Sequence, residues 1–491
     1  MWFLCNDYVY EPVAYSLSCV QKASINWATS WDELPTRTRC RASLNWSQSV
    51  LGKPSSGIGK MWTIILIASF AVLGTSADIG PELWRVEAPG HHIAVRALAD
   101  EGNVDVWGHT PSHTKVLVEA EAKSRVARAL DEANLKHSVE VPDVLALVEE
   151  ERAHMQEKRR KRESEQMDWT TFHDLEDIEG FEEWLNFTSS QLVQMASVAR
   201  TLEGREVRLV RITDPSTPGP KKKIWIEGGI HAREWISPAV TTYLMHQVAV
   251  SPEWRDILKV TEWYFVPVAN PDGYAYSFSS PRARLWRKNR SQNGPSARCK
   301  GVDLNRNWNL KWGVGASGNP CSETFKGKEP FSEPETVGLG RAMHRVRDID
   351  VFITFHSFGQ TVLYPWGWTR DPPANVKQLS RLARKFNEGV KAASGGRTEY
   401  EIGGSGPLYG LASGASDDWA YGALQVPFSY TIELPDTGSH GFLLPESEVS
   451  RVVVETNSGM HCMIGFLTNI GPCARHGTNR SKSVGFRGFR G

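Results

Sequence analysis

The chain has 491 residues, of which 40% are hydrophobic, and its 56 Lys and Arg residues equal its 56 Asp and Glu residues in number. This length exceeds one ordinary domain, and the apolar share excludes a chain that is disordered throughout. A zero net charge gives no support for a nucleic acid or an anionic membrane as a partner, and we expect neither.

The first segment with a clear pattern resembles a secretory signal peptide. An apolar run from Met61 to Gly74 follows a lysine and precedes three small residues, and it is short for a membrane span. We therefore expect residues 61–77 to be a signal peptide on a secreted protein, and residues 1–60 to be an upstream extension. The alternative is an internal signal anchor in a type II membrane protein.

The cysteines divide at the same point. Of the seven, Cys5, Cys19 and Cys40 precede Met61, which leaves Cys299, Cys321, Cys462 and Cys473. An even number in the remaining chain suits an oxidising compartment, as secretion predicts.

Residues 78–162 are predicted to form a small α+β domain. Residues 93–98, 104–107, 115–119 and 137–141 read as short strands, and residues 120–135 and 143–158 have helical composition and spacing. Asp143 follows a proline and can act as the N-cap of the second helix.

That helix runs into five basic residues, Lys158 to Arg162. Such a run is often a solvated surface or an interaction patch. Its place between a small domain and a larger one in a secreted chain favours proteolysis instead. We expect cleavage near Arg162 by a trypsin-like or furin-like protease.

The long segment 163–470 alternates apolar strand-like runs with helical stretches, as a protein with an α/β sheet does. Open α/β sheets bind ligands at strand ends. The remaining residues, 471–491, form a basic tail rich in Gly and Ser that we expect to be disordered.

Three residues in this segment have the pattern of a catalytic metal site. His231 and Glu234 lie three residues apart, directly after the apolar run 224–226, which brings them to one side of a turn or helix start. His356 ends a second apolar run, 351–355. Catalytic zinc commonly takes three protein ligands, and two histidines with one glutamate is a standard set. The sequence predicts one zinc ion here.

Seven separate motifs accompany these ligands in the order typical of one protease family. They are His-Ala-Arg-Glu-Trp (231–235), Asn-Pro-Asp-Gly-Tyr (270–274), Leu-Trp-Arg-Lys-Asn-Arg (285–290), Gly-Val-Asp-Leu-Asn-Arg-Asn-Trp (301–308), Phe-His-Ser (355–357), Ser-Asp-Asp-Trp (416–419) and Thr-Ile-Glu-Leu-Pro-Asp-Thr-Gly (431–438). The chain resembles the pancreatic-type zinc carboxypeptidases of the A/B group from about residue 169 to about residue 465.

The resemblance implies the fold and the activity together. It predicts a mixed-sheet α/β/α catalytic domain, preceded by a small α+β activation domain that inhibits it. The protein would be a zymogen that hydrolyses the last residue of peptides and proteins with a free C-terminus.

The resemblance also assigns roles to single residues, which are matched motif by motif. Glu433 is the general base, and Arg287 stabilises the oxyanion. Asp303 orients a zinc histidine. The residues matched to substrate binding are Arg233, Asn305, Arg306 and Tyr409.

Substrate preference depends on Asp417, which matches the base of the specificity pocket. An aspartate there implies a preference for C-terminal Lys or Arg, the B-type pattern. Against this, Gly367 is more typical of A-type relatives, and the segment 409–419 is one residue longer than in typical relatives. The alternatives are that Asp417 or Asp418 only bonds loop backbone and that the preference is for apolar or aromatic residues.

A further alternative is an inactive carboxypeptidase-like binding protein, which the presence of all three ligands and the base disfavours. The resemblance implies one disulfide, Cys299 with Cys321, which would leave Cys462 to pair with Cys473. Free thiols remain an alternative, because sequence alone does not determine connectivity.

Overall fold

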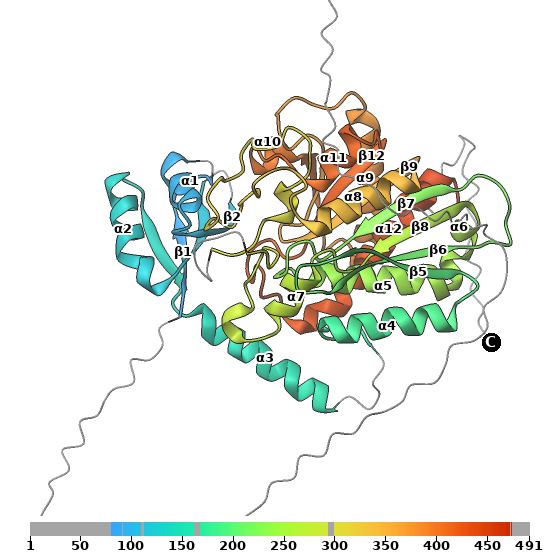
Figure 1. Ribbon diagram of the computed structural model, residues 1–491, viewed down its shortest axis with the longest axis horizontal. Helices are drawn as coiled ribbons and strands as arrows, with labels where there is room; N and C mark the ends of the chain where they lie inside the picture. The colour runs from blue at the N-terminus through green and yellow to red at the C-terminus, as the bar shows by residue number, and fades with distance from the viewer. Residues whose placement is uncertain are drawn as a thin grey trace, which may run out of the picture. The chain divides into compact units, whose positions relative to one another are not determined.

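The computed structural model describes residues 80–90, 92–109, 112–161, 167–292, 299–471 and 473 (Figure 1). The predicted extension (1–60), the predicted signal peptide (61–77), Arg162 and nearly all of the tail (471–491) lie outside the described residues. In the part that is described, no helix is long and apolar enough to cross a membrane.

The N-terminal domain is a four-stranded antiparallel sheet covered on one face by two helices. Its elements are β1 (Glu82–Val86), α1 (Ile93–Asp100), β2 (Asp105–His109), β3 (Thr114–Val118), α2 (Lys123–Glu132) and β4 (His137–Val141). The strand order is β2-β3-β1-β4. Trp84, Val95, Val116 and Val126 belong to the core between sheet and helices. The predicted α+β class is confirmed.

One predicted strand in this domain is wrong. Residues 93–98 lie in the helix α1, whose N-cap His92 accepts a hydrogen bond from the Ala94 amide. Alternation of Ile93 and Val95 suggested a strand, but Ile93 is 82% exposed, and the buried residues are Val95 and Leu98. Burial at a spacing of three residues is the helical pattern.

The α3 helix (Val144–Lys161) leads from this domain towards the catalytic domain, as predicted for residues 143–158. The Asp143 side chain accepts a hydrogen bond from the Ala146 amide, 3.1 Å away. This bond satisfies a donor in the first turn, which is the predicted N-cap role.

The catalytic domain is built on an eight-stranded mixed sheet in the order β11-β10-β12-β9-β7-β8-β6-β5. The strands are β5 (Val193–Arg200), β6 (Glu206–Thr213), β7 (Lys222–Glu227), β8 (Thr261–Val266), β9 (Ile349–Ser357), β10 (Thr361–Tyr364), β11 (Glu401–Gly404) and β12 (Phe428–Leu434). The central strands β12, β9, β7 and β8 are parallel, whereas β6 and β5 are antiparallel.

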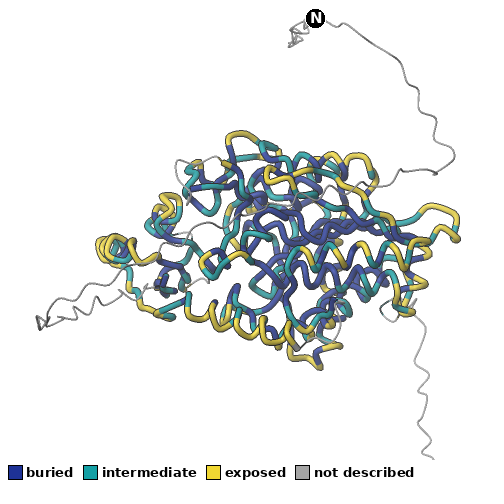
Figure 2. Tube along the Cα trace, turned by 60° about the horizontal axis from the view of Figure 1, so that its bottom comes forward, coloured by how far each residue is buried: buried dark blue, intermediate teal, exposed yellow. Residues whose placement is uncertain are grey.

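Helices cover both faces of this sheet. The helices are α4 (Leu175–Thr188), α5 (Ile236–Val250), α6 (Arg255–Val260), α7 (Pro271–Ser277), α8 (Pro334–Val346), α9 (Val376–Ser394), α10 (Ser405–Tyr409), α11 (Ser416–Gly422) and α12 (Val449–Thr468). One core joins the sheet to α4, α5, α9 and α12, and another joins it to α8 and α11. The central strands are buried along most of their length (Figure 2). This arrangement is the predicted α/β/α domain.

The sheet topology brings distant residues together at one edge. The parallel strands β7, β9 and β12 all end on the same side, and His356 on β9 is the register partner of Glu433 on β12. Residues at or just after these strand ends form the site described next, in the position where open α/β sheets bind ligands.

Candidate metal centre and substrate site

His231, Glu234 and His356 come together as a buried group that could hold a metal ion. Their ligand atoms all lie within 4.8 Å of one another. His231 Nδ1 lies 2.8 Å from a Glu234 oxygen and 3.0 Å from His356 Nδ1, which itself lies 3.0 Å from the other Glu234 oxygen. Two imidazole nitrogens and one carboxylate suit zinc, so the donor set fits the predicted ion.

The first two ligands lie in the short connection between β7 and α5. Gly229 adopts a positive φ of 63°, and a Cβ there would come within 3.1 Å of Pro238. Its amide donates to Ser237 Oγ, which in turn donates to the Phe355 carbonyl on β9. This pair of bonds ties the turn that carries His231 to the strand that carries His356.

Asp303 contacts the metal group through the His231 ring. One of its oxygens lies 3.1 Å from His231 Nε2, and the other accepts from the Arg287 guanidinium at 2.9 and 3.2 Å. Burial opposes its ionisation, but the charge of Arg287, followed by that of His231, holds the pKa of Asp303 well below its usual value. An anionic partner on Nε2 orients the ring so that Nδ1 faces the metal position.

Arg287 lies beside the metal group, with its guanidinium 3.9 Å from Glu234. Glu433 lies on the next strand, and burial raises its pKa to about 8, with His356 opposing and Glu234 adding to the shift. A bound dication would favour the carboxylate and lower this value. The structure thus places both predicted catalytic side chains near the predicted ligands.

Asn305 and Arg306 lie in a short 3₁₀ helix, Leu304–Arg306, whose N-cap is Asp303. The Asp303 side chain accepts from the Asn305 amide at 2.9 Å, so one carboxylate fixes both His231 and this turn. Asn305 Nδ2 lies 3.4 Å from His356 Nε2. The Arg306 guanidinium donates to the Asn305 carbonyl, and it interacts electrostatically with Asp417 and Glu433.

The two adjacent aspartates of α11 differ in their partners. Asp418 accepts from the Gly367 amide at 3.0 Å and from the Trp368 amide at 3.3 Å, so it bonds loop backbone. Asp417 is 3% exposed and accepts hydrogen bonds from the Asp418 amide of its own helix and from the Thr431 side chain. Burial raises the pKa of Asp417.

Tyr409, at the end of α10, reaches across to the strands of the site. Its hydroxyl lies 3.2 Å from Thr361 Oγ1 on β10, next to Glu433 in the sheet register. A Cβ at Gly359 would collide with this hydroxyl, so the glycine makes room for it.

Arg233 is bound by the N-terminal domain. Its guanidinium forms an ion pair with Asp105 of β2 through both oxygens, one of them 3.1 Å away, and stacks on Phe442 at 4.1 Å. Arg233 is 1% exposed as a result. Asp105 was not expected from the sequence, where nothing distinguishes it from other acidic residues of a strand.

A second arginine, Arg284, is held by the α3 helix. It donates to Glu151 at 2.6 and 3.1 Å, to the Arg233 carbonyl at 2.8 Å and to the Phe442 carbonyl at 2.7 Å. Its guanidinium also lies 3.6 Å from the Trp235 ring. Neither Glu151 nor Arg284 was predicted, because their pairing depends on how α3 docks.

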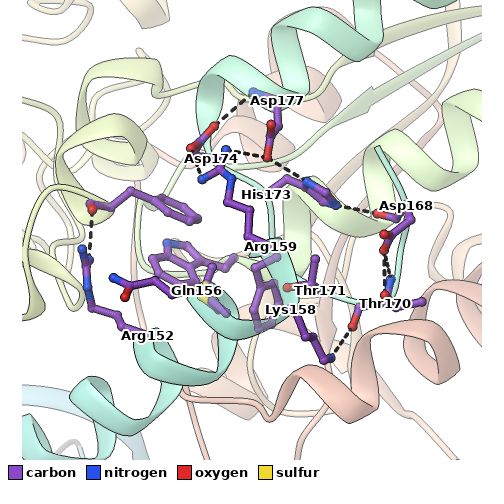
Figure 3. A pocket seen from close by; sticks show the side chains of 14 residues that line it. Arg152, Gln156, Lys158, Arg159, Asp168, Thr170, Thr171, His173, Asp174 and Asp177 are labelled. Carbon is purple, nitrogen blue, oxygen red and sulfur yellow. Dashed lines mark hydrogen bonds and ion pairs between the residues drawn. The ribbon is translucent and has the colours of Figure 1, made fainter. Parts of the chain in front are cut away.

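The basic run at the end of α3 also contacts the catalytic domain (Figure 3). Arg159 points towards Asp174 and Asp177, at 2.9 and 3.0 Å, and Lys158 donates to the Thr170 carbonyl at 3.0 Å. These contacts line a cavity of about 390 Å³ between α3 and the start of the catalytic domain.

Both predicted disulfides form, Cys299 with Cys321 and Cys462 with Cys473. The first closes the loop that contains the 3₁₀ helix Leu304–Arg306. The second joins α12 to residue 473.

Comparisons with known proteins agree with this geometry. The family described as zinc carboxypeptidase matches residues 178–459, and the family described as carboxypeptidase activation peptide matches residues 85–151. Carboxypeptidase B of Astacus astacus is 42% identical over 61% of the chain and 98% of its own length, and carboxypeptidase A4 of Mus musculus is 34% identical over 79% and 94%.

A solved structure shares the fold over both domains. The carboxypeptidase A structure from Helicoverpa armigera aligns with a TM-score of 0.73 at 27% identity, covering 79% of this chain and 97% of that one. With the three-ligand group, the mixed sheet and both family matches in agreement, this chain belongs to the zinc carboxypeptidases and carries their activation peptide.

Proposed function

We propose that the protein is a secreted zymogen whose activated form removes C-terminal Lys or Arg from peptides and proteins. The observation that carries the proposal is the register of β9 and β12, which pairs the ligand His356 with Glu433 at the strand ends. A base beside a three-ligand metal group is the arrangement that metal-assisted hydrolysis requires.

Each side chain has a separate task in this proposal. His231, Glu234 and His356 would hold zinc, which would supply a Lewis acid and lower the pKa of the attacking water. Glu433 accepts the proton of the attacking water and passes it to the leaving amine. Arg287, kept in place by Asp303, provides a fixed positive charge where the oxyanion develops.

Recognition of a free C-terminus falls to Asn305 and Arg306. A guanidinium donates two parallel hydrogen bonds to a carboxylate, which makes Arg306 the stronger partner. Tyr409 would cover the bound residue, since its hydroxyl lies near Glu433 in the sheet.

Preference for Lys or Arg rests on Asp417. A buried carboxylate is costly without a cation, and no salt bridge to Asp417 exists among the described residues. A cationic substrate side chain would neutralise it, whereas an apolar one would not. The neighbouring carboxylate does not compete for this role, because Asp418 is occupied by the Gly367 and Trp368 amides.

Substrate preference can be tested with peptides that differ only in the last residue. The activated enzyme should release Arg and Lys faster than Leu or Phe, and Asp417→Ile should shift the preference towards Leu and Phe. A wild-type enzyme that already removes Phe faster than Arg would instead support the A-type alternative.

The intact chain should be inactive, because the activation peptide binds Arg233, which lies two residues after the ligand His231, and also Arg284, which donates to the Arg233 carbonyl. Cleavage near Arg162 by a trypsin-like or furin-like protease would release residues 78–162 from the catalytic domain, 163–470. Secretion would depend on the segment 61–77.

A further inference from the structure

Glu227, the last residue of β7, is a buried acid with no evident part in the chemistry described above. It is 0% exposed, and its Oε1 accepts a hydrogen bond from Ser416 Oγ at 2.7 Å. No salt bridge connects it to a cation within the described ranges. Burying a carboxylate in this way is costly, so a specific use for it is expected.

Its partner Ser416 lies between two substrate-binding features. Ser416 is the first residue of α11, directly before Asp417. Its amide donates to Asn305 Oδ1 at 3.0 Å, which leaves the Asn305 Nδ2 group facing the metal side, 3.4 Å from His356 Nε2. Ser416 therefore fixes the Asn305 amide through its backbone and is itself fixed by Glu227 through its hydroxyl.

The strand that carries Glu227 also makes this anchor rigid. Glu227 is the register partner of Thr354 on β9, two residues before His356. Both strands belong to the buried centre of the sheet. The central sheet is a rigid support for Ser416. Helix α11, with only seven residues, is a less rigid support on its own.

We propose that Glu227 is a positioning residue that acts through Ser416 on substrate recognition. It fixes the orientation of the Asn305 amide and the position of the Asp417 carboxylate. It thereby strengthens binding of the substrate's terminal carboxylate and the preference for Lys or Arg. This inference rests on the proposed function.

The hydrogen bond, rather than the negative charge, carries this role. Burial raises the pKa of Glu227 to about 7, with the Ser416 hydrogen bond and then His356 opposing the shift, whereas a bound dication would lower it. The hydrogen bond does not depend on which form of the acid is present. Either form offers an oxygen to the Ser416 hydroxyl. Glu227→Gln should therefore preserve the function, and Glu227→Ala should not.

The test compares these two variants with Ser416→Ala in the activated enzyme. We expect Glu227→Ala and Ser416→Ala each to raise KM for a C-terminal Arg substrate by about tenfold, roughly the effect of one hydrogen bond, with a smaller change in kcat. Both should lower the ratio of kcat/KM for Arg over Leu. The double variant should be no worse than either single one, because one contact is lost in all three.

A buried acid elsewhere provides the control. Glu182 on α4 is 3% exposed, and Glu182→Ala should change neither KM nor the Arg-to-Leu ratio. Zinc content should remain at one per chain in every variant.

Several results would overturn the inference while leaving the proposed function intact. The first is an unchanged KM and an unchanged Arg-to-Leu ratio of kcat/KM in Ser416→Ala. The second is an equal loss of kcat/KM for the Arg and Leu substrates in Glu227→Ala. The third is a Glu227→Gln enzyme that is as impaired as Glu227→Ala. If Glu227→Ala fails to fold, the Ser416→Ala result decides. A wild-type enzyme that releases no C-terminal residue would instead contradict the proposed function.

Discussion

Asp105 of the activation peptide and Arg233 of the catalytic domain form a two-point ion pair two residues after the metal ligand His231. Asp105 keeps 15% of its side-chain surface and Arg233 keeps 1%, so the pair is largely shielded from water. Glu151 and Arg284 form a second pair, whose side chains are 9% and 0% exposed. The two pairs bind β2 and α3 to neighbouring parts of the same surface.

The first prediction concerns these two pairs. Asp105→Asn or Glu151→Gln should weaken inhibition by the separated activation peptide on the order of tenfold or more, because each change leaves a buried arginine without its anion. The inhibition constant of the isolated peptide against the activated enzyme measures this. Glu150→Gln is the matched control, since Glu150 is exposed on the same helix. Equal inhibition by the wild-type peptide and all three variant peptides would contradict the ion-pair explanation.

The second prediction concerns processing. Replacing all five residues of the basic run Lys158 to Arg162 with alanine should leave the chain uncleaved and inactive. Lys158, Arg159 and Arg160 are all exposed, but Lys158 and Arg159 also form ion pairs with the catalytic domain. Trypsin should therefore cut first after Arg160 or a residue C-terminal to it, and only afterwards after Arg159. Mass spectrometry of the first products measures this order. Full activity in the uncleaved alanine variant would refute the zymogen proposal.

The third prediction separates the metal from the base. Glu433→Gln should keep one zinc per chain and lose kcat by a factor on the order of 10²–10⁴, because the water would lack its proton acceptor. Removing zinc from the wild-type enzyme with a chelator should abolish activity, and adding zinc should restore it. Near-normal turnover by Glu433→Gln would rule out its assignment as base.

The fourth prediction follows from a buried acid away from the metal ligands. Burial raises the pKa of Glu335 to about 8, and this residue is 1% exposed. The neutral form is the one the fold favours, so its stabilising contribution is complete below the unfolded pKa of about 4.3 and is lost as pH rises towards 8. Glu335→Gln keeps an acceptor for Asn289 and removes the titration.

We therefore expect the Tm of Glu335→Gln, relative to wild type, to increase between about pH 4.3 and about pH 8, the window set by those two pKa values. Thermal unfolding at constant zinc across this range measures the difference. A difference in Tm that stays constant or shrinks with rising pH would show that Glu335 is ionised in the folded protein.

The metal ligands and the α/β alternation could be predicted from local sequence patterns, whereas the mixed sheet was predicted from the family resemblance. The spacing of His231 and Glu234 and the apolar runs before each ligand fix their places at strand ends. Helix α1 was missed for the opposite reason. Its exposed Ile93 alternates with Val95, which imitates the pattern of a strand.

Contacts between the two domains could not be predicted from the sequence, for a different reason. Asp105 and Arg233 are 128 residues apart, and Glu151 and Arg284 are 133 apart. Nothing in the spacing of such residues marks them as partners, because their meeting depends on the docking of the whole activation peptide. The role of Asp418 likewise required the fold of the loop that carries Gly367.

The most direct test of the central claim uses two peptides that end in Arg, one with a free carboxylate and one with a C-terminal amide. Release of the terminal residue by the activated enzyme is measured for both, with and without a chelator. The account predicts zinc-dependent release of Arg from the free acid and little or none from the amide, since Arg306 would lack its anionic partner. Equal release from both peptides, or release that persists without zinc, would contradict it.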